Sequence, residues 1–360
     1  MKGLWKRYFL SRWLPSFILF LKGYRVRPHL KCLDMKCTMS DNPLTTAVPT
    51  REKGIYGDDT RLAVSEDFLE KLALKKDQKD QMFVQQARAS CILVFAPRLK
   101  KKDDHWLLKT KLYHEENNLC EDEKFYGNPA LGFCSGFAFE KDNEYYVCAA
   151  GHCSRDIKAS QIAFVFDFRQ DKDGQFPSSV PLEKVVFPVN TPSPFAFSYT
   201  NDAQDFVVFK CATPPPYSLP YSMLDSKGII KKGDAIVMLG HPCGIPQISD
   251  EGTVLDTPHK TYFRTNLSAY HGNSGSAVIQ KSTGQLVGIL VRGDQDFQLS
   301  MKGMCYKSAK CPLDAEGCRG EDVVRMDVIL KYAFDKDHKE VKEEQEKTTW
   351  APTKFKCSGC

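Results

Sequence analysis

The sequence predicts an all-β protein, an antiparallel sandwich or barrel, and three observations support this. From Ala89 onward, short apolar or alternating runs recur along the chain. Gly, Pro, Asn and Asp residues separate the runs, as turns between strands require. Little helical periodicity lies between them, which argues against strands that alternate with helices around a parallel sheet.

Ten runs are expected to form strands: SCILVFAP, GFCSGFAFE, EYYVCAAG, QIAFVFDF, KVVFPV, DFVVFKC, DAIVMLG, TYFRTNL, SAVIQ and QLVGILV. The strand zone ends near Leu330. The segment from Gly320 to Phe334 mixes strand and helix periods, so a short strand or a helical docking segment is expected there.

Two segments precede the strands. Residues 1–37 form a basic leader with a short apolar run, Trp13 to Leu21, which Pro15 interrupts and which is too short to span a membrane. We expect a secretory signal and a secreted protein. An organelle transit peptide, a cytoplasmic protein that starts at Met39, and a leader retained as a membrane anchor remain open.

Residues 38–88 are expected to hold a polar linker or pro-segment followed by a helix. Ser65 can cap a helix that runs to about Lys75. The apolar side chains on or near one stripe of this helix are Phe68, Leu69, Leu72 and Leu74. Beyond the strand zone, residues 335–360 form a charged tail.

Composition and charge narrow the function classes. The 360 residues carry a net charge of +5, with basic residues crowded near the amino terminus, so nucleic acid is not an expected partner. Fourteen cysteines favour an oxidising compartment. Two of them end the chain as CSGC, and without a second such pair they are a weak zinc motif.

The motif AYHGNSGSAVIQ places Ser274 in a bend between Gly272 and Gly275. Glycines allow backbone conformations in which amide groups turn toward one point, which suits a nucleophile on a preset turn. A plain hairpin turn is the simpler structural interpretation.

An imidazole and a carboxylate complete a possible catalytic set. His152 follows an apolar strand in YYVCAAGHCSRD, and Asp205 precedes a buried run in NDAQDFVVFK. Taken singly, each has an ordinary structural explanation, as an exposed histidine and a turn aspartate. Together with Ser274 they supply the nucleophile, base and orienting carboxylate that serine catalysis needs.

The segments AAGHC, DFVVF and GNSGSAV resemble the three signature regions of trypsin-like serine peptidases, in the same order. The segments GHPCGIP, YFRTNLSAYHGNSGS and TGQLVGILVRGD resemble the branch that includes the bacterial glutamyl endopeptidases. The resemblance extends from about Tyr56 to Arg325. It implies a peptidase domain over residues 89–334, made of two antiparallel six-stranded β-barrels with short helical segments at each end.

The resemblance also implies an activity. Ser274 would attack the scissile carbonyl and form an acyl-enzyme, His152 would act as base and then acid, and Asp205 would hold the imidazole. The backbone N–H groups of Gly272 and Ser274 would form the oxyanion hole. Protein or peptide substrates, a monomer, and no cofactor or metal are expected. The alternative is a catalytically silent module that binds peptides or proteins on the same fold.

The cysteines are interpreted in the same way. Cys134 and Cys153 occupy positions where trypsin-like peptidases carry a disulfide beside the histidine, so this pairing is expected. Cys305, Cys311 and Cys318 form a second cluster, of which at least one must pair elsewhere or stay free.

The substrate pocket in this family is bounded by Ser268 and by the strand that holds Leu290 and Gly293. No acidic residue is found for Lys or Arg, and Leu290 stands where the glutamate-specific relatives have a histidine. An apolar or small side chain is therefore the expected preference. His271 is near the nucleophile and could contribute to this preference, but an exposed turn histidine is the simpler interpretation. Arg292 and Asp294 could pair with charged substrate residues or with each other across the rim.

The segment GIYGDD, which begins at Gly54, resembles the new amino terminus of activated trypsin-like zymogens. In those enzymes the ammonium pairs with an aspartate just before the nucleophile. Here that residue is Asn273, and a neutral amide cannot form the ion pair. This activation switch is therefore expected to be absent.

Overall fold

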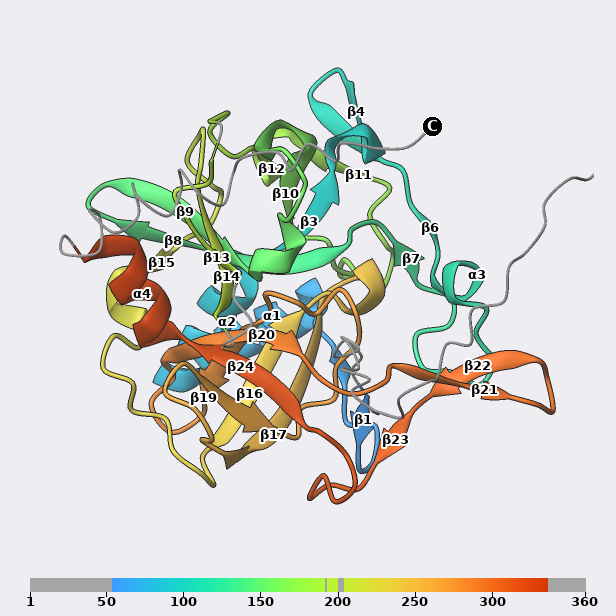
Figure 1. The fold of residues 1–360 in the computed structure, drawn as a ribbon. Coiled ribbons are helices and arrows are strands. Elements are labelled where there is room, and N and C mark those ends of the chain that lie inside the picture. The colour runs from blue at the N-terminus through green and yellow to red at the C-terminus, as the bar shows by residue number, and fades with distance from the viewer. Residues whose placement is uncertain (1–53, 192, 200–203, 336–360) are drawn as a thin grey trace, which may run out of the picture. The chain divides into compact units, whose positions relative to one another are not determined.

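The computed structural model describes residues 54–191, 193–199 and 204–335, and this part of the chain is mostly β-strand with few helices (Figure 1). The leader and nearly all of the charged tail, including CSGC, lie outside the described residues. Among the described residues, no helix is both long and apolar enough to cross a membrane.

The later strands form a closed six-stranded barrel. Each strand pairs antiparallel with the next in the order β16, β19, β20, β24, β18, β17, and β17 pairs with β16 to close the ring. The bounds are Ala235–Gly240 (β16), Ile248–Asp256 (β17), Tyr262–Thr265 (β18), Ala277–Gln280 (β19), Leu286–Arg292 (β20) and Glu321–Arg325 (β24). Apolar side chains such as Met238, Phe263 and Leu290 pack in one buried cluster. One of the two predicted barrels is thus confirmed.

The earlier strands form a sheet in the order β12, β10, β3, β8, β9, β14, β13, with β15 parallel to β8. The bounds are Ser90–Phe95 (β3), Cys134–Lys141 (β8), Glu144–Ala149 (β9), Ile162–Phe166 (β10), Val185–Val186 (β12), Ala196–Tyr199 (β13), Asp205–Lys210 (β14) and Leu219–Pro220 (β15).

This sheet does not close by a ladder of paired strands within the described residues. A single bridge joins Pro188 to Cys211, where Val189 N donates to Lys210 O at 2.8 Å. Pro188 has no N–H to donate, so β12 cannot continue as a regular strand along β14. The second six-stranded barrel of the prediction is therefore not confirmed.

All ten predicted strand runs contain a strand. Several strands escaped prediction, and the longest is β17, whose sequence ISDEGTVLD is largely polar. The other strands are Ile55–Tyr56 (β1), Leu62–Ala63 (β2), Leu99–Lys102 (β4), His105–Leu108 (β5), Lys111–Leu112 (β6), Pro129–Ala130 (β7), Ser179–Pro181 (β11), Phe297–Ser300 (β21), Cys305–Ser308 (β22) and Lys310–Cys311 (β23).

The predicted first helix is present. Helix α1 spans Glu66–Ala73, and the Ser65 side chain accepts a hydrogen bond from Phe68 N. Of the predicted stripe, Leu69 and Leu72 are buried whereas Phe68 and Leu74 are exposed. The other helices are Gln78–Ala89 (α2), Tyr113–Asn117 (α3) and Met326–Phe334 (α4). Helix α2 was not predicted, because its sequence is polar and lacks a clear apolar stripe.

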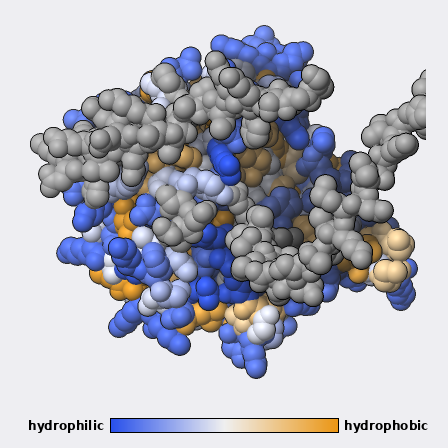
Figure 2. Space-filling model, in the orientation of Figure 1, coloured by the Kyte–Doolittle hydropathy of each residue, from blue (hydrophilic) through white to orange (hydrophobic). Residues whose placement is uncertain are grey.

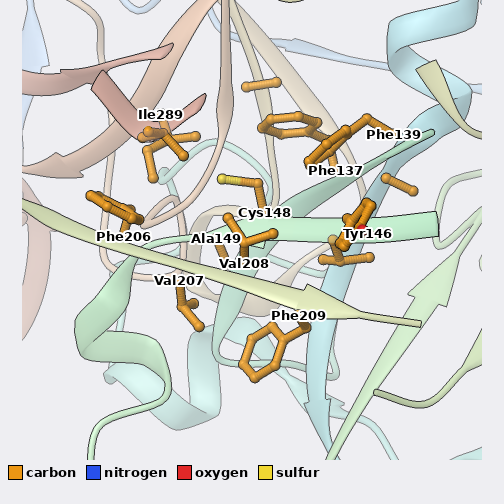
Figure 3. Packing of buried hydrophobic residues seen from close by; sticks show 14 of the residues in the cluster. Phe137, Phe139, Tyr146, Cys148, Ala149, Phe206, Val207, Val208, Phe209 and Ile289 are labelled. Atoms are coloured by element: carbon orange, nitrogen blue, oxygen red, sulfur yellow. The ribbon is translucent and has the colours of Figure 1, made fainter. Parts of the chain in front are cut away.

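The segment from Gly320 to Phe334, whose periodicity mixed strand and helix, forms strand β24 and then helix α4. The buried face of α4 joins the largest apolar cluster, which contains residues of both sheets. Figure 3 shows part of this cluster, in which Ile289 of β20 lies with Phe206 of β14 and Cys148 of β9. The two sheets therefore share a core.

The β21–β22 hairpin projects from the described body (Figure 1). Leu299, Met301 and Met304 on it are exposed. A pale orange group lies at the right edge of Figure 2, where Figure 1 places this hairpin.

Candidate active site

His152 and Asp205 meet because two strands pair antiparallel. Ala149, at the end of β9, lies opposite Val207 near the start of β14, so the residues that follow β9 lie beside the first residue of β14. Asp205 Oδ2 lies 2.8 Å from His152 Nδ1, and Asp205 Oδ1 accepts a 2.8 Å hydrogen bond from His152 N. With both oxygens engaged, the carboxylate holds the ring and the backbone of His152 together.

Gly151 allows this close approach. A Cβ at this position would lie 2.6 Å from Ser198 O and 2.9 Å from Phe206 N, on two neighbouring strands. Any larger residue would push the histidine turn away from β14. The glycine before His152 is therefore required by the packing of the site.

Ser274 lies in a turn that needs left-handed glycines on both sides. Gly272 has φ +86° and Gly275 has φ +89°, which residues with a Cβ rarely adopt. A Cβ at Gly275 would collide with Ser135 O and would lie 2.9 Å from Ala150 N. The turn thus packs directly against the segment that leads to His152.

Further contacts hold the Ser274 backbone. Ser135 N donates to Ser274 O at 2.9 Å, and Gly275 N donates to Leu290 O at 2.7 Å. The sulfur of Cys153, the neighbour of His152, lies 3.8 Å from Ser274 O. The structure therefore brings the histidine, aspartate and serine segments to one place, where β8, β9, β14 and β20 adjoin.

The predicted pocket residues are Ser268, Leu290 and Gly293. They lie near this turn, and each contacts other residues of the protein. Ser268 is 1% exposed, and its Oγ accepts a hydrogen bond from Tyr56 N at 3.2 Å. Leu290 is 0% exposed, packs inside the barrel, and donates its N–H to Ser276 O. Gly293 lies against the carboxylate of Glu321, which a Cβ at Gly293 would strike.

Glu321 is the main acidic residue that the sequence interpretation missed here. It is fully buried on β24, and its Oε1 is within 3.4 Å of Asp294 N. Glu321 lies next to Gly293 because β24 pairs with β20, and no local sequence motif predicts this pairing. A buried acidic group therefore lies beside Gly293.

Arg292 and Asp294, the two charged residues on either side of Gly293, have other partners than each other. Arg292 Nε lies 3.1 Å from Asp322 Oδ2, and Asp294 Oδ2 accepts a hydrogen bond from Tyr56 OH at 2.8 Å.

The segment that resembles a zymogen amino terminus is docked near the site. Ile55 is 0% exposed, and β1 pairs in parallel with β23. Gly54 O accepts a 3.0 Å hydrogen bond from the N–H of Ala269, which lies two residues before His271 in the chain. This segment, which the sequence assigned to a polar linker or pro-segment, is therefore packed against β23 and the residues that precede the serine turn.

The structure pairs Cys134 with Cys153, as the resemblance implied, and joins β8 to the histidine turn. Of the second cluster, Cys311 pairs with Cys318, and Cys305 pairs with Cys120. The unpaired cysteines among the described residues are Cys91, Cys148, Cys211 and Cys243, all buried. Burial raises the pKa of Cys91, Cys148 and Cys211, so these three thiols stay protonated.

Two groups of metal-ligating atoms lie close together in the described residues. They are Cys134, His152 and Cys153, and Asp294, Cys311 and Cys318. In each group both cysteines form a disulfide, so neither group offers a thiolate ligand.

A family model matches part of this chain. Residues 134–289 match the model of the trypsin-like peptidase domain, a range that includes His152, Asp205 and Ser274. The match supports a serine protease of the trypsin-like family, with the chymotrypsin-type fold. It does not distinguish the glutamyl-endopeptidase branch.

Among solved structures, this chain is similar to an HtrA-type protease, AlgW with decapeptide, at 16% identity and a TM-score of 0.41. A serine-to-alanine variant of AlgW, also with decapeptide, is similar at 15% identity and a TM-score of 0.41. The alignments cover 71% of this chain in both cases, and 66% and 65% of the two AlgW chains. No curated protein matches this chain.

Proposed function

We propose that this protein is a serine endopeptidase that hydrolyses peptide bonds through Ser274, His152 and Asp205. The observation that carries the proposal is the pair of contacts by which Asp205 holds His152, beside the left-handed glycine turn of Ser274: Oδ1 accepts a hydrogen bond from His152 N, and Oδ2 lies against His152 Nδ1. A carboxylate bound to Nδ1 leaves Nε2 as the nitrogen that takes up a proton.

In this mechanism His152 removes the proton of Ser274 Oγ as that oxygen attacks the substrate carbonyl. Asp205 stabilises the imidazolium that forms, and the imidazolium then protonates the leaving amine. The product of this step is an acyl-enzyme at Ser274. Water, activated by His152 in the same way, hydrolyses the acyl-enzyme and regenerates the serine.

The backbone N–H groups of Gly272 and Ser274 are proposed to bind the oxyanion. The left-handed φ of Gly272 and Gly275 supports this role, because it shapes the turn around Ser274. Donors preset at the oxyanion each contribute roughly 3–4 kcal/mol of transition-state stabilisation in enzymes of this kind.

The compartment is also a proposal. Three disulfides among the described residues favour an oxidising environment and so favour secretion of the protein. The mature amino terminus of protein purified from its native source, determined by mass spectrometry, tests this: a terminus that retains Met1 contradicts a cleaved signal.

Fluorophosphonate labelling tests the catalytic proposal. The purified protein is expected to be labelled at one site, and Ser274→Ala is expected to abolish both labelling and peptide cleavage. Ser282→Ala, an exposed serine on a remote turn, is the matched control and should keep both. Unchanged labelling of Ser274→Ala contradicts the assignment. A folded protein that binds peptides, takes no label and cleaves nothing in a peptide library supports the silent binding module instead.

A further inference from the structure

His271, the residue before the proposed oxyanion glycine, is tied down by Asp296. Asp296 Oδ2 accepts a 2.9 Å hydrogen bond from His271 N and lies 2.6 Å from His271 Nδ1. One carboxylate oxygen therefore binds both the backbone and the side chain of His271. The sequence interpretation treated His271 as an ordinary exposed turn histidine and did not single out Asp296.

The opposite end of the same residue is held as well. His271 O accepts a 2.6 Å hydrogen bond from Cys243 N. In a trans peptide the N–H points away from the preceding C=O, so fixing His271 O also fixes the direction of Gly272 N–H. A Cβ at Gly272 would lie 2.7 Å from Cys243 N and 2.8 Å from His241 O, so one side of Gly272 faces this turn. Its N–H is therefore directed away from Cys243.

Asp296 is itself well placed to act as an anchor. It is 8% exposed and lies directly before β21, and its backbone oxygen accepts a 2.9 Å hydrogen bond from Ala309 N. Ala309 O in turn accepts from Ile55 N at 3.0 Å. The carboxylate thus belongs to a framework built from the hairpin and the docked β1 segment.

The electrostatic surroundings of His271 strengthen its contact with Asp296. Cys243 Sγ lies 3.6 Å from His271 Nδ1. The pKa of His271 is raised above its ordinary value, first by its electrostatic interaction with nearby Cys243 and then by Asp296, against the cost of burial. A protonated ring binds the Asp296 carboxylate more strongly than a neutral one.

We infer that Asp296 is a positioning residue for the proposed peptidase, one that holds the His271–Gly272 peptide so that Gly272 N–H stays directed at the oxyanion. This inference rests on the proposed function. Asn273 cannot form the ammonium–aspartate ion pair that the resemblance associates with this task. The carboxylate of Asp296, which lies directly before β21, holds the His271–Gly272 peptide instead of that ion pair.

The test compares steady-state kinetics of the full chain and three variants. Asp296→Ala removes the contacts of the carboxylate with His271 N and His271 Nδ1, and it is expected to lower kcat by about tenfold to 1000-fold. The upper end of this range corresponds to complete loss of one oxyanion donor. KM should stay within about twofold, because the pocket is untouched. Asp296→Asn keeps an acceptor oxygen for His271 N and should recover part of kcat. The affinity of a peptide boronic acid should fall in parallel with kcat/KM.

Asp225→Ala is the matched control. Asp225 is 1% exposed and accepts hydrogen bonds from the backbone N–H groups of Lys227, Gly228 and Ile229, away from the serine turn. It should lose stability but keep kcat. A kcat within twofold of wild type in folded Asp296→Ala overturns the inference, as does a change in KM alone. If Asp296→Ala does not fold, Asp296→Asn decides: a kcat within twofold of wild type overturns the inference.

The experiment distinguishes a failure of the proposed peptidase function from a failure of the positioning role of Asp296. A wild-type protein that takes no fluorophosphonate label and cleaves no peptide defeats both proposals at once. Normal wild-type turnover with no effect at Asp296 defeats only the positioning role.

Discussion

Two buried aspartates in this protein show how the partners of a side chain set its role. Asp205 lies on the edge of the proposed catalytic centre and binds two groups of His152. Asp250 is 1% exposed and accepts hydrogen bonds from Ser268 N and Thr60 Oγ1. Desolvation raises the pKa of Asp250 to about 6, although both hydrogen bonds and Arg61 oppose the shift.

This shift predicts a pH-dependent stability. The folded protein retains the Asp250 proton up to about pH 6, whereas the unfolded chain loses it near its ordinary value of about 4. Wild-type stability should therefore fall as pH rises through this window. Asp250→Asn, which stays neutral, should match wild type near pH 4 and exceed it above pH 6 by on the order of 3 kcal/mol.

Urea unfolding at several pH values measures this difference. Asp314→Asn, at an exposed loop position, is the control and should show no such trend. A difference between Asp250→Asn and wild type that stays constant from pH 4 to pH 8 would contradict the pKa shift.

At the scale of elements, the histidine turn is held by a short covalent loop. The Cys134–Cys153 disulfide spans 19 residues and joins β8 to the turn that carries His152. Gly151 and Gly275 bring the same turn against β14 and against the serine turn. The disulfide therefore limits how far the histidine segment can separate from β8 in the unfolded chain.

The double variant Cys134→Ala/Cys153→Ala is expected to lose about 3 kcal/mol of unfolding free energy, because the unfolded chain regains the entropy of that loop. Cys311→Ala/Cys318→Ala, whose loop spans 7 residues, is the comparison and should lose less. Denaturant unfolding under non-reducing conditions gives both values. Wild-type stability in the first variant would show that the pairing does not form.

At the scale of the whole described region, one apolar cluster joins the first sheet, the closed barrel and helix α4. Phe334 of α4 contacts Phe139 and Tyr146 of the sheet, and Ile329 of the same helix is buried in the cluster. Because the proposed catalytic residues come from both sheets, this shared core sets their separation.

Ile329→Ala is expected to cost about 2–5 kcal/mol, the range for truncating a buried aliphatic side chain. Both sheets should still unfold in one transition, seen as coincident curves by circular dichroism and fluorescence. Lys331→Ala, at an exposed position of the same helix, should change stability by less than about 0.5 kcal/mol. Separate transitions for the two probes would show that the sheets do not fold as one unit.

Much of this architecture could be predicted from local patterns. Each of the ten apolar runs contains a strand, and the Ser65 cap marks the start of α1, because burial of one face and satisfaction of helix-end amides are recorded in neighbouring residues. The polar elements β17 and α2 were not predicted, because they gain their stability from partners across the fold rather than from their own apolar stripes.

The sequence alone determined that the chain is β-rich and that a histidine, an aspartate and a serine follow one another in strand-end contexts, since strand periodicity and turn chemistry are local properties. Only the tertiary structure decided which distant groups meet. Asp205 reaches His152 through the pairing of β9 with β14, and Asp296 reaches His271 from its position directly before β21. It also decided how each sheet is joined, since β17 pairs with β16 to close the second sheet, whereas in the described part of the first sheet a single bridge joins Pro188 to Cys211. Ring closure depends on the register of strands far apart along the chain, which no short segment encodes.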